Sequence, residues 1–223
     1  MKNIIIYLIT LFFVPFLMSQ SISIEWQKSL GGTIDDNARA SVFTSDGGCI
    51  IAGEAFSNNG NVSGNHGSDD YWVIDLDKNG NLLWQKCYGG TSVEWANSIK
   101  ATNTNEYIIV GKTFSNDGDV TGNNGRADYW ILIITQSGSI VWEKTYGGSE
   151  SDIPHSIDIL DNSDLAITGM SWSEDGDVTA HHGCKDYSDY WTVKLSLSTG
   201  VADIQPTKKL IKISFFLIQH MIL

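Results

Sequence analysis

The sequence is dominated by a unit of 58 residues that occurs three times along the chain. Single tryptophans and paired glycines recur at this spacing, at Trp26, Trp84 and Trp142 and at Gly31-Gly32, Gly89-Gly90 and Gly147-Gly148. A second tryptophan column, Trp72 and Trp130, continues at Trp191 after an insertion near 186–188. Such a chain is expected to fold into three copies of one substructure, each packed against its neighbours.

Each unit predicts four short strands. In the first unit, residues 36–43 are small and mixed, residues 49–53 are mainly apolar, and residues 72–76 alternate in the period-two pattern of a half-buried strand. A turn signal at Asn79-Gly80 precedes the fourth strand, within 82–88. No segment has a sustained helical period. The sequence therefore predicts an all-β, β-propeller-like fold with three four-stranded blades.

The repeat starts and stops out of phase. The chain begins with a lone fourth strand at 24–30, and its third unit ends after three strands, at 191–195. Three blades are fewer than the four to eight that close a propeller ring. We therefore expect an open arc, a fragment of a longer array, or half of a six-bladed ring formed by a homodimer. A β-trefoil, which is a compact monomer, is the alternative fold.

The two ends of the chain differ from the repeat. Lys2 and the apolar run that follows it have the layout of a secretory signal peptide, so we assign residues 1–20 to it. The repeat domain comprises residues 21–200. Residues 201–223 form a divergent tail that we expect to be poorly ordered. Neither end predicts a membrane span in the mature protein. A secreted or outer cell-surface location follows, with the periplasm as an alternative.

Composition excludes two classes of partner. The chain has 26 acidic and 14 basic residues, a net charge of -12. Nucleic acid and anionic membrane surfaces both need a basic footprint, so neither is expected as a partner. The odd number of cysteines, Cys49, Cys87 and Cys184, permits one disulfide and one free thiol in an exported protein.

Three segments carry a resemblance to a known group of proteins. They are Trp84-Gln-Lys-Cys-Tyr-Gly-Gly, the turn Asp46-Gly-Gly and the loop Ser115-Asn-Asp-Gly-Asp-Val-Thr-Gly. Over residues 24–195 the chain resembles secreted bacterial repeat proteins with Gly-, Asp- and Trp-rich units of this length. The resemblance implies a β-propeller. Members of the group are loosely labelled endoglucanase-like or quinoprotein-like and supply no catalytic motif to transfer.

Variation between units separates candidate site residues from structural ones. Columns that keep one residue type in every unit are explained by the fold, so both tryptophan columns are expected in the core, together with Trp172. Trp95 aligns with Asn37 and Ile153 and is the better candidate for stacking on a ligand. Two columns on the predicted innermost strand would line a site near the axis, namely Asp36, Glu94 and Asp152 and the variable Arg39, Asn97 and His155.

The polar loops of the three units allow a calcium interpretation, since Ca²⁺ prefers clustered oxygen ligands. Their sequences are Asn59-Gly60-Asn61, Asp117-Gly118-Asp119 and Asp175-Gly176-Asp177. They do not have EF-hand spacing, so we expect tight turns and no resident metal or other cofactor. A further column, Asp70, Asp128 and Asp189, is expected to fasten the loop to the strand that follows.

The sequence contains no Gly-x-Ser-x-Gly, phosphate-loop or zinc-helix motif. It therefore favours an exported binding or interaction module with glycan or protein ligands. A polysaccharide hydrolase that uses carboxylates of the Asp36, Glu94 and Asp152 column is the first alternative. A truncated, non-functional piece of a longer repeat protein is the second, because the tail breaks the pattern.

Overall fold

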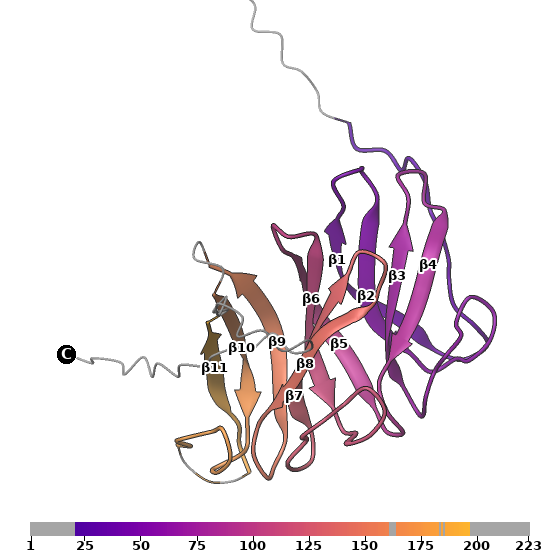
Figure 1. Cartoon of the computed structure of the whole chain (residues 1–223). Coiled ribbons are helices and arrows are strands. Elements are labelled where there is room, and N and C mark those ends of the chain that lie inside the picture. Colours follow the sequence, from indigo (N-terminus) through magenta and orange to yellow (C-terminus); the bar gives the residue numbers. More distant parts are fainter. Residues whose placement is uncertain (1–20, 161–163, 183, 185, 197–223) are drawn as a thin grey trace, which may run out of the picture.

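The computed structural model describes residues 21–160, 164–182, 184 and 186–196. This part of the chain is all-β and forms three antiparallel sheets (Figure 1). Sheet 1 has the order β1 (Asp36–Phe43), β2 (Cys49–Ala55), β3 (Asp70–Leu76), β4 (Leu82–Tyr88). Sheet 2 has the order β5 (Glu94–Ala101), β6 (Glu106–Thr113), β7 (Asp128–Thr135), β8 (Ile140–Tyr146). Sheet 3 contains β9 (Asp152–Ile159), β10 (Leu165–Ser171) and β11 (Asp189–Leu195).

Each sheet is an up-and-down meander built from one sequence unit, as the repeat predicts. The hairpins turn at glycines with positive φ, including Gly47 at 88°, Gly80 at 75° and Gly138 at 73°. Strands pair within their own unit, and the bridge between Asp69 and Val93 joins units 1 and 2 outside the named strands. The three separate meanders contradict the trefoil alternative, because a β-trefoil shares one barrel among its units.

The innermost strands β1, β5 and β9 lie beside one another, and each contains a β-bulge. In the pairing of each innermost strand with its neighbour, one residue has no cross-strand partner. These bulge residues are Arg39, Asn97 and His155. A glycine stands opposite each bulge, at Gly53, Gly111 and Gly169. A Cβ at Gly111 would lie 1.9 Å from the carbonyl oxygen of Trp95, so no larger residue fits there. The glycine column is thus required by the bulge.

Neighbouring sheets are joined by a tyrosine from the third strand. Tyr71 in β3 donates a hydrogen bond of 3.1 Å to the carbonyl oxygen of Trp130 in β7, and the two rings lie 4.5 Å apart. Tyr129 makes the same contacts with Trp191 in β11. Tyr71, Tyr129 and Trp130 are fully buried and belong to the apolar clusters between the sheets. The second tryptophan column is core as predicted at Trp130 and, at 7% exposure, at Trp72.

The first tryptophan column lies nearer the surface than predicted. Trp84 donates from Nε1 to the carbonyl oxygen of Gln136 in the β7–β8 turn, 3.1 Å away. Trp26 occupies the same position over Gly80 in the β3–β4 turn but is 40% exposed. Trp172 is half-buried rather than core. The rings of Trp26 and Trp84 thus cover a hairpin turn of the next sheet, and Trp84 and Trp142 pack at the margin of the apolar clusters.

Residues 24–30 were predicted as a strand, and this prediction is wrong. The segment has no strand assignment, because no strand of the described residues pairs with it. It follows the outer side of sheet 1, where Leu30 packs on the cluster that contains Trp72 and Leu76 (Figure 1).

The remaining sequence predictions concern the two ends of the chain and the cysteines. The signal peptide at 1–20 and the tail at 201–223 lie outside the described residues. Within the described ranges, no helix is long and apolar enough to cross a membrane. Cys49, Cys87 and Cys184 are all free thiols.

Candidate functional site

The acidic column at the start of the innermost strands serves the junctions between units. Glu94 accepts hydrogen bonds from the backbone N–H of Gly90 at 2.8 Å and from the hydroxyl of Thr113 at 2.8 Å. Asp152 accepts from the N–H of Gly148 at 2.8 Å and from the hydroxyl of Ser173 at 2.9 Å. Both carboxylates are fully buried. They hold the paired glycines that link one sheet to the next.

Asp36 repeats this arrangement at the start of the first unit. It accepts from the N–H of Gly32 at 2.7 Å and from the hydroxyl of Ser57 at 2.8 Å. The expectation that Asp36, Glu94 and Asp152 line an open site at the axis is therefore wrong. The physical reason is that the N–H groups of Gly90 and Gly148 are buried donors that need an acceptor, and the half-buried Asp36 is engaged by Gly32 in the same way.

The second acidic column fastens the loop as predicted. The backbone N–H groups of His66 and Asn124 donate to Asp70 and Asp128, at 3.0 and 2.8 Å, and that of His182 donates to Asp189. In the first unit, His66 Nδ1 also lies 2.6 Å from Asp70. The second unit has Asn124 there, so this side-chain partner is missing at Asp128.

The junction between sheets 2 and 3 holds two close carboxyl groups, as the junction between sheets 1 and 2 does with Asp70 and Glu94. Oδ1 of Asp128 and Oδ2 of Asp152 lie 2.3 and 2.7 Å from the point where a Cβ of Gly147 would stand. Oδ1 of each is buried without a hydrogen-bond partner among the described residues. Burial raises the pKa of Asp128 to about 7, and it also raises the pKa of Asp152.

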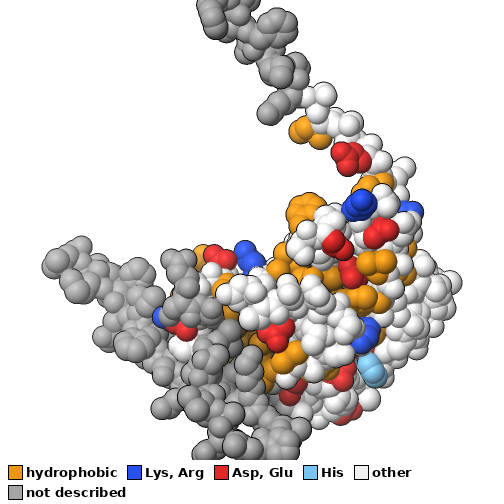
Figure 2. Space-filling view, turned by 45° about the horizontal axis from the view of Figure 1, so that its top comes forward, with side chains coloured by type: hydrophobic (Ala, Val, Ile, Leu, Met, Phe, Trp, Pro, Cys, Tyr) orange, Lys and Arg blue, Asp and Glu red, His pale blue; other side chains and the backbone are white. Residues whose placement is uncertain are grey.

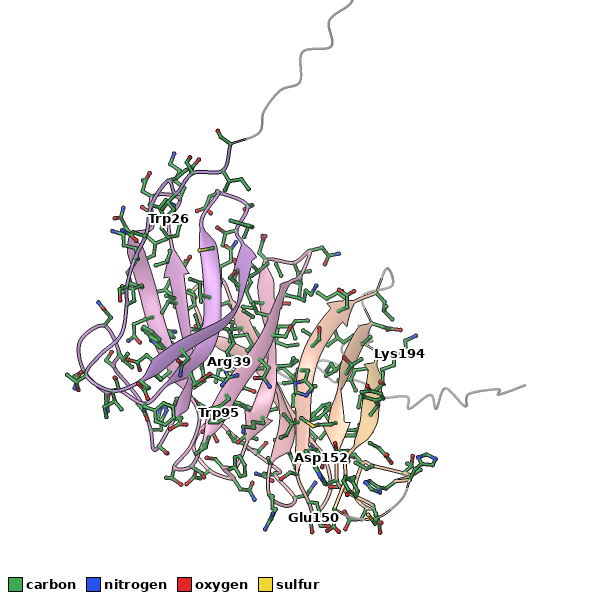
Figure 3. All side chains as sticks on the ribbon, turned by 180° about the vertical axis from the view of Figure 1, so that it is seen from behind. Trp26, Arg39, Trp95, Glu150, Asp152 and Lys194 are labelled. Carbon is green, nitrogen blue, oxygen red and sulfur yellow. The ribbon has the colours of Figure 1, made fainter. Side chains whose placement is uncertain are left out.

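The residues that vary between units gather at the other junction, between sheets 1 and 2. Together with Phe114, whose column is aromatic in all three units, they form what we call the cation–indole cluster, which consists of Arg39, Glu54, Asp69, Trp95, Lys112 and Phe114. Figure 3 shows Arg39 and Trp95 side by side, on β1 and β5. Trp95 pairs with Lys112 across β5 and β6, while Arg39 is the bulge residue of β1. The bulge turns the Arg39 side chain toward the neighbouring sheet.

The indole of Trp95 is the centre of this cluster. Lys112 Nζ lies 3.6 Å and Arg39 Cζ lies 5.0 Å from the ring centroid, within the range of cation–π contacts. Trp95 Nε1 donates a hydrogen bond of 2.7 Å to the buried carboxylate of Asp69. Lys112 Nζ also lies 5.3 Å from the ring of Phe114, which is 40% exposed. The ring is thus fixed at its nitrogen, and an exposed aromatic face lies next to it.

The two cations are in different electrostatic situations. Arg39 forms a two-point ion pair with Glu54, at 2.5 and 2.8 Å, and this hydrogen bonding raises the Arg39 pKa. Lys112 has no carboxylate within 4.0 Å among the described residues. Burial and the nearby Arg39 charge lower its pKa, with Glu54 and Asp69 acting in the opposite direction. An anion bound in the cluster would therefore pair with Lys112 more readily than with Arg39, which already has a carboxylate partner.

The predicted site residues divide into three groups. Arg39 and Trp95 meet in the cluster, as expected of variable positions. Asn97 donates a hydrogen bond of 2.6 Å to the carbonyl oxygen of Pro154 and so joins β5 to β9. His155 is exposed. The acidic column is structural.

The prediction missed Glu54, Asp69, Lys112 and Phe114. A signal for two of them was present, because Glu54, Lys112 and Met170 form a variable column like the one that singled out Trp95. These β2, β6 and β10 positions pair directly with Asn37, Trp95 and Ile153. The pairing register was the missing information.

The polar loops contain the turns that the sequence predicts. Gly60, Gly118 and Gly176 have φ values of 66°, 63° and 67°. Asn59, Asp117 and Asp175 accept the backbone N–H groups of Thr33, Thr91 and Ser149, at 2.9, 2.8 and 2.7 Å. No group of three potential metal ligands occurs within the described ranges.

Comparisons with known proteins add little to this geometry. No protein-family model matches the chain, and no curated protein matches it. Among solved structures, the chain is similar to a protein of unknown function from Bacteroides caccae, with 12% sequence identity and a TM-score of 0.37. The match covers 73% of this chain and 43% of that protein, so this chain spans less than half of its length.

Proposed function

We propose that this protein is an exported binding module of the β-propeller type, and that the cation–indole cluster binds a carboxylated glycan. The observation that carries the proposal is the position of Lys112, a cation stacked on Trp95 without an ion-pair partner among the described residues. In a repeat fold, positions that differ between the units, such as Arg39, Trp95 and Lys112, are not required by the repeat itself. Ligand binding would give them a role.

The ligand class follows from the chemistry of the cluster. The exposed ring of Phe114 offers an apolar face on which the C–H groups of a sugar ring can stack, and Lys112 and Arg39 lie beside it. A carboxylate on the sugar would pair with Lys112 and leave the Arg39–Glu54 pair intact. Uronic acids combine a stacking face and a carboxylate in one residue, so we expect oligouronides to bind better than neutral glucans.

The propeller assignment rests on the arrangement of the sheets. The innermost strands lie beside one another, each sheet is a meander, and tyrosines connect successive sheets in the same way. The apolar segment within 1–20 supports export. A hydrolase has less support, because the carboxylates assigned to it are engaged by buried backbone donors.

The test is binding of oligogalacturonides, measured by calorimetry and by the fluorescence of Trp95. Lys112→Met is the informative variant, since methionine occupies the equivalent position in the third unit, at Met170. A lost charge-assisted contact is worth about 1.5–3 kcal/mol, so binding should weaken by about 10- to 100-fold. Lys100→Met, which removes a surface cation that pairs with Asp158, is the matched control and should bind as the wild type.

Two results would overturn the proposal. One is an affinity for neutral cello-oligosaccharides equal to that for oligogalacturonides. The other is unchanged oligogalacturonide affinity in Lys112→Met, with wild-type thermal unfolding as evidence that the variant is folded.

A further inference from the structure

The two junctions inside the chain share one docking geometry. The hydroxyl of Tyr71 lies 2.6 Å from the point where a Cβ of Gly111 would stand, and it donates to the carbonyl oxygen of Trp130. The hydroxyl of Tyr129 stands in the same way beside Gly169, at 2.4 Å, and donates to Trp191. Each junction is thus a tyrosine inserted beside the bulge glycine and the tryptophan of the next sheet.

The third sheet carries the same tyrosine, but no other sheet of the described part of the chain packs against it. Tyr190 occupies the column of Tyr71 and Tyr129 in β11, yet its side chain is 100% exposed, whereas theirs are fully buried. β11 is also an outer strand of its sheet within the described residues, because the order there is β11-β10-β9. Among residues 21–196 as described, sheet 3 therefore has neither a fourth strand nor a sheet packed on its outer face.

Sheet 1 has a cavity at the equivalent place, where the tyrosine of a preceding sheet would insert. A cavity of about 280 Å³ is lined by Gly53 and Trp72, which are the equivalents of Gly111 and Trp130. The N-terminal segment forms one wall, with Trp26 and Leu30. Figure 2 shows hydrophobic side chains at the surface where this segment meets the body of the protein.

The N-terminal segment also has the side-chain pattern of a fourth strand. Trp26 covers Gly80 in the turn of sheet 1, as Trp84 covers Gly138 in the turn of sheet 2. Gly31 and Gly32 then meet Asp36 as Gly89 and Gly90 meet Glu94. The segment thus stands where β4 of a preceding sheet would stand, and the described residues contain no such sheet.

We propose that sheet 3 of one copy docks on sheet 1 of a second copy, with Tyr190 inserted beside Gly53 and Trp72. The N-terminal segment of the second copy would then border β11 and complete sheet 3. One chain cannot do this alone, since β11 and the N-terminal segment lie at opposite ends of the array (Figure 1). Two copies that dock reciprocally give six sheets, within the range that closes a propeller, and the inference shares the propeller assignment made above.

The free face of sheet 3 is more polar than the internal faces. Threonine stands at Thr168 and Thr192 where sheet 2 has Val110 and Ile131, and Lys194 replaces Ile133. Such a face is compatible with water, so the docked state should exchange with free monomers instead of being obligate. The dimer is therefore expected to depend on protein concentration.

The test is the molar mass of the full chain over a concentration series, by analytical ultracentrifugation. We expect a monomer–dimer equilibrium in the wild type and at least a tenfold weaker dimer in Tyr190→Ala. Tyr187→Ala is the control, because this tyrosine is 72% exposed but lies outside the docking column. A photo-crosslinker at position 190 should attach to sheet 1 of the second copy or to the N-terminal segment that lines its cavity.

Three results would overturn the inference. They are a monomer at every concentration, crosslinks from position 190 that fall outside sheet 1 and the N-terminal segment lining its cavity, and open-ended growth past the dimer. Oligogalacturonide binding by Tyr190→Ala reports on the cation–indole cluster independently, so failure of the docking and failure of the proposed function are distinguishable.

Discussion

Asp128 makes the fold sensitive to pH in a way that Asp128→Asn should remove. The carboxyl group is fully buried, and burial raises its pKa from 3.8 to about 7. The backbone N–H of Asn124 acts in the opposite direction, while the carboxylates of Asp152 and Asp177 raise the pKa further. Asp128 is therefore protonated in the folded state over a pH range in which it is ionised in the unfolded chain.

The pH dependence of the unfolding free energy follows from the difference between the folded and unfolded pKa values of Asp128. A carboxyl with a raised folded pKa contributes its full stability below about pH 4 and loses it as the pH rises through about 7. One pKa unit corresponds to about 1.36 kcal/mol, so the loss between pH 5 and pH 8 is about 2.5 kcal/mol. Asparagine stays neutral and can donate toward Asp152. Asp128→Asn should therefore be more stable than the wild type at pH 8, with the difference shrinking toward pH 5.

The assay is urea unfolding of both proteins at pH 5, 6, 7 and 8, with the difference in unfolding free energy taken at each pH. Taking the difference cancels the titration of the groups that do not interact with Asp128. Asp70→Asn is the matched control, because it breaks the contact with His66 Nδ1 at 2.6 Å and should destabilise the protein. A difference between wild type and Asp128→Asn that is constant across this range would refute the reasoning.

Three further predictions concern the junctions and the cysteines. Tyr71→Phe removes a buried hydroxyl and should lower the unfolding free energy by about 1–2 kcal/mol, whereas Tyr190→Phe in dilute monomer should leave it unchanged in the same urea titration. Gly111→Ala places a Cβ 1.9 Å from a carbonyl oxygen and should cost at least about 3 kcal/mol; a melting temperature equal to that of the wild type would contradict this. Burial raises the pKa of Cys87 to about 12, so Ellman's reagent at pH 8 should modify the exposed Cys184 and spare Cys87 until denaturant is added.

The sequence predicted the sheets well because their signals are local. The period-two alternation placed residues 72–76 in one strand, which lies within β3, and the repeat pattern placed a strand at 36–43, which is β1. The loop-fastening role of Asp70 was also predictable, since an aspartate after a polar loop has backbone donors within a few residues. The strand predicted at 24–30 failed because a strand requires a pairing partner, and the repeat pattern does not supply one.

The candidate site was only half predictable, for a geometric reason. Variation between units identified Arg39 and Trp95, and the structure brings them together. The same criterion did not single out Lys112, because its importance depends on the register that pairs it with Trp95. Glu94 was misassigned because its partners are the backbone N–H of Gly90 and the hydroxyl of Thr113, which lies 19 residues away, so its chemistry is visible only once the loops are placed.

The two internal junctions share a fold but divide the chemistry between them. At the first junction, His66 supplies a partner for the buried Asp70, and the cation–indole cluster fills the variable positions. At the second, Asn124 replaces that histidine, and Ile153 stands where Trp95 does. Residues that are the same in every unit hold one sheet to the next. The chemical differences between the two junctions therefore come from the positions that vary between units. A ligand site at the first junction and a proton-sensitive contact at the second are therefore compatible in one chain, and a change at either should leave the other intact.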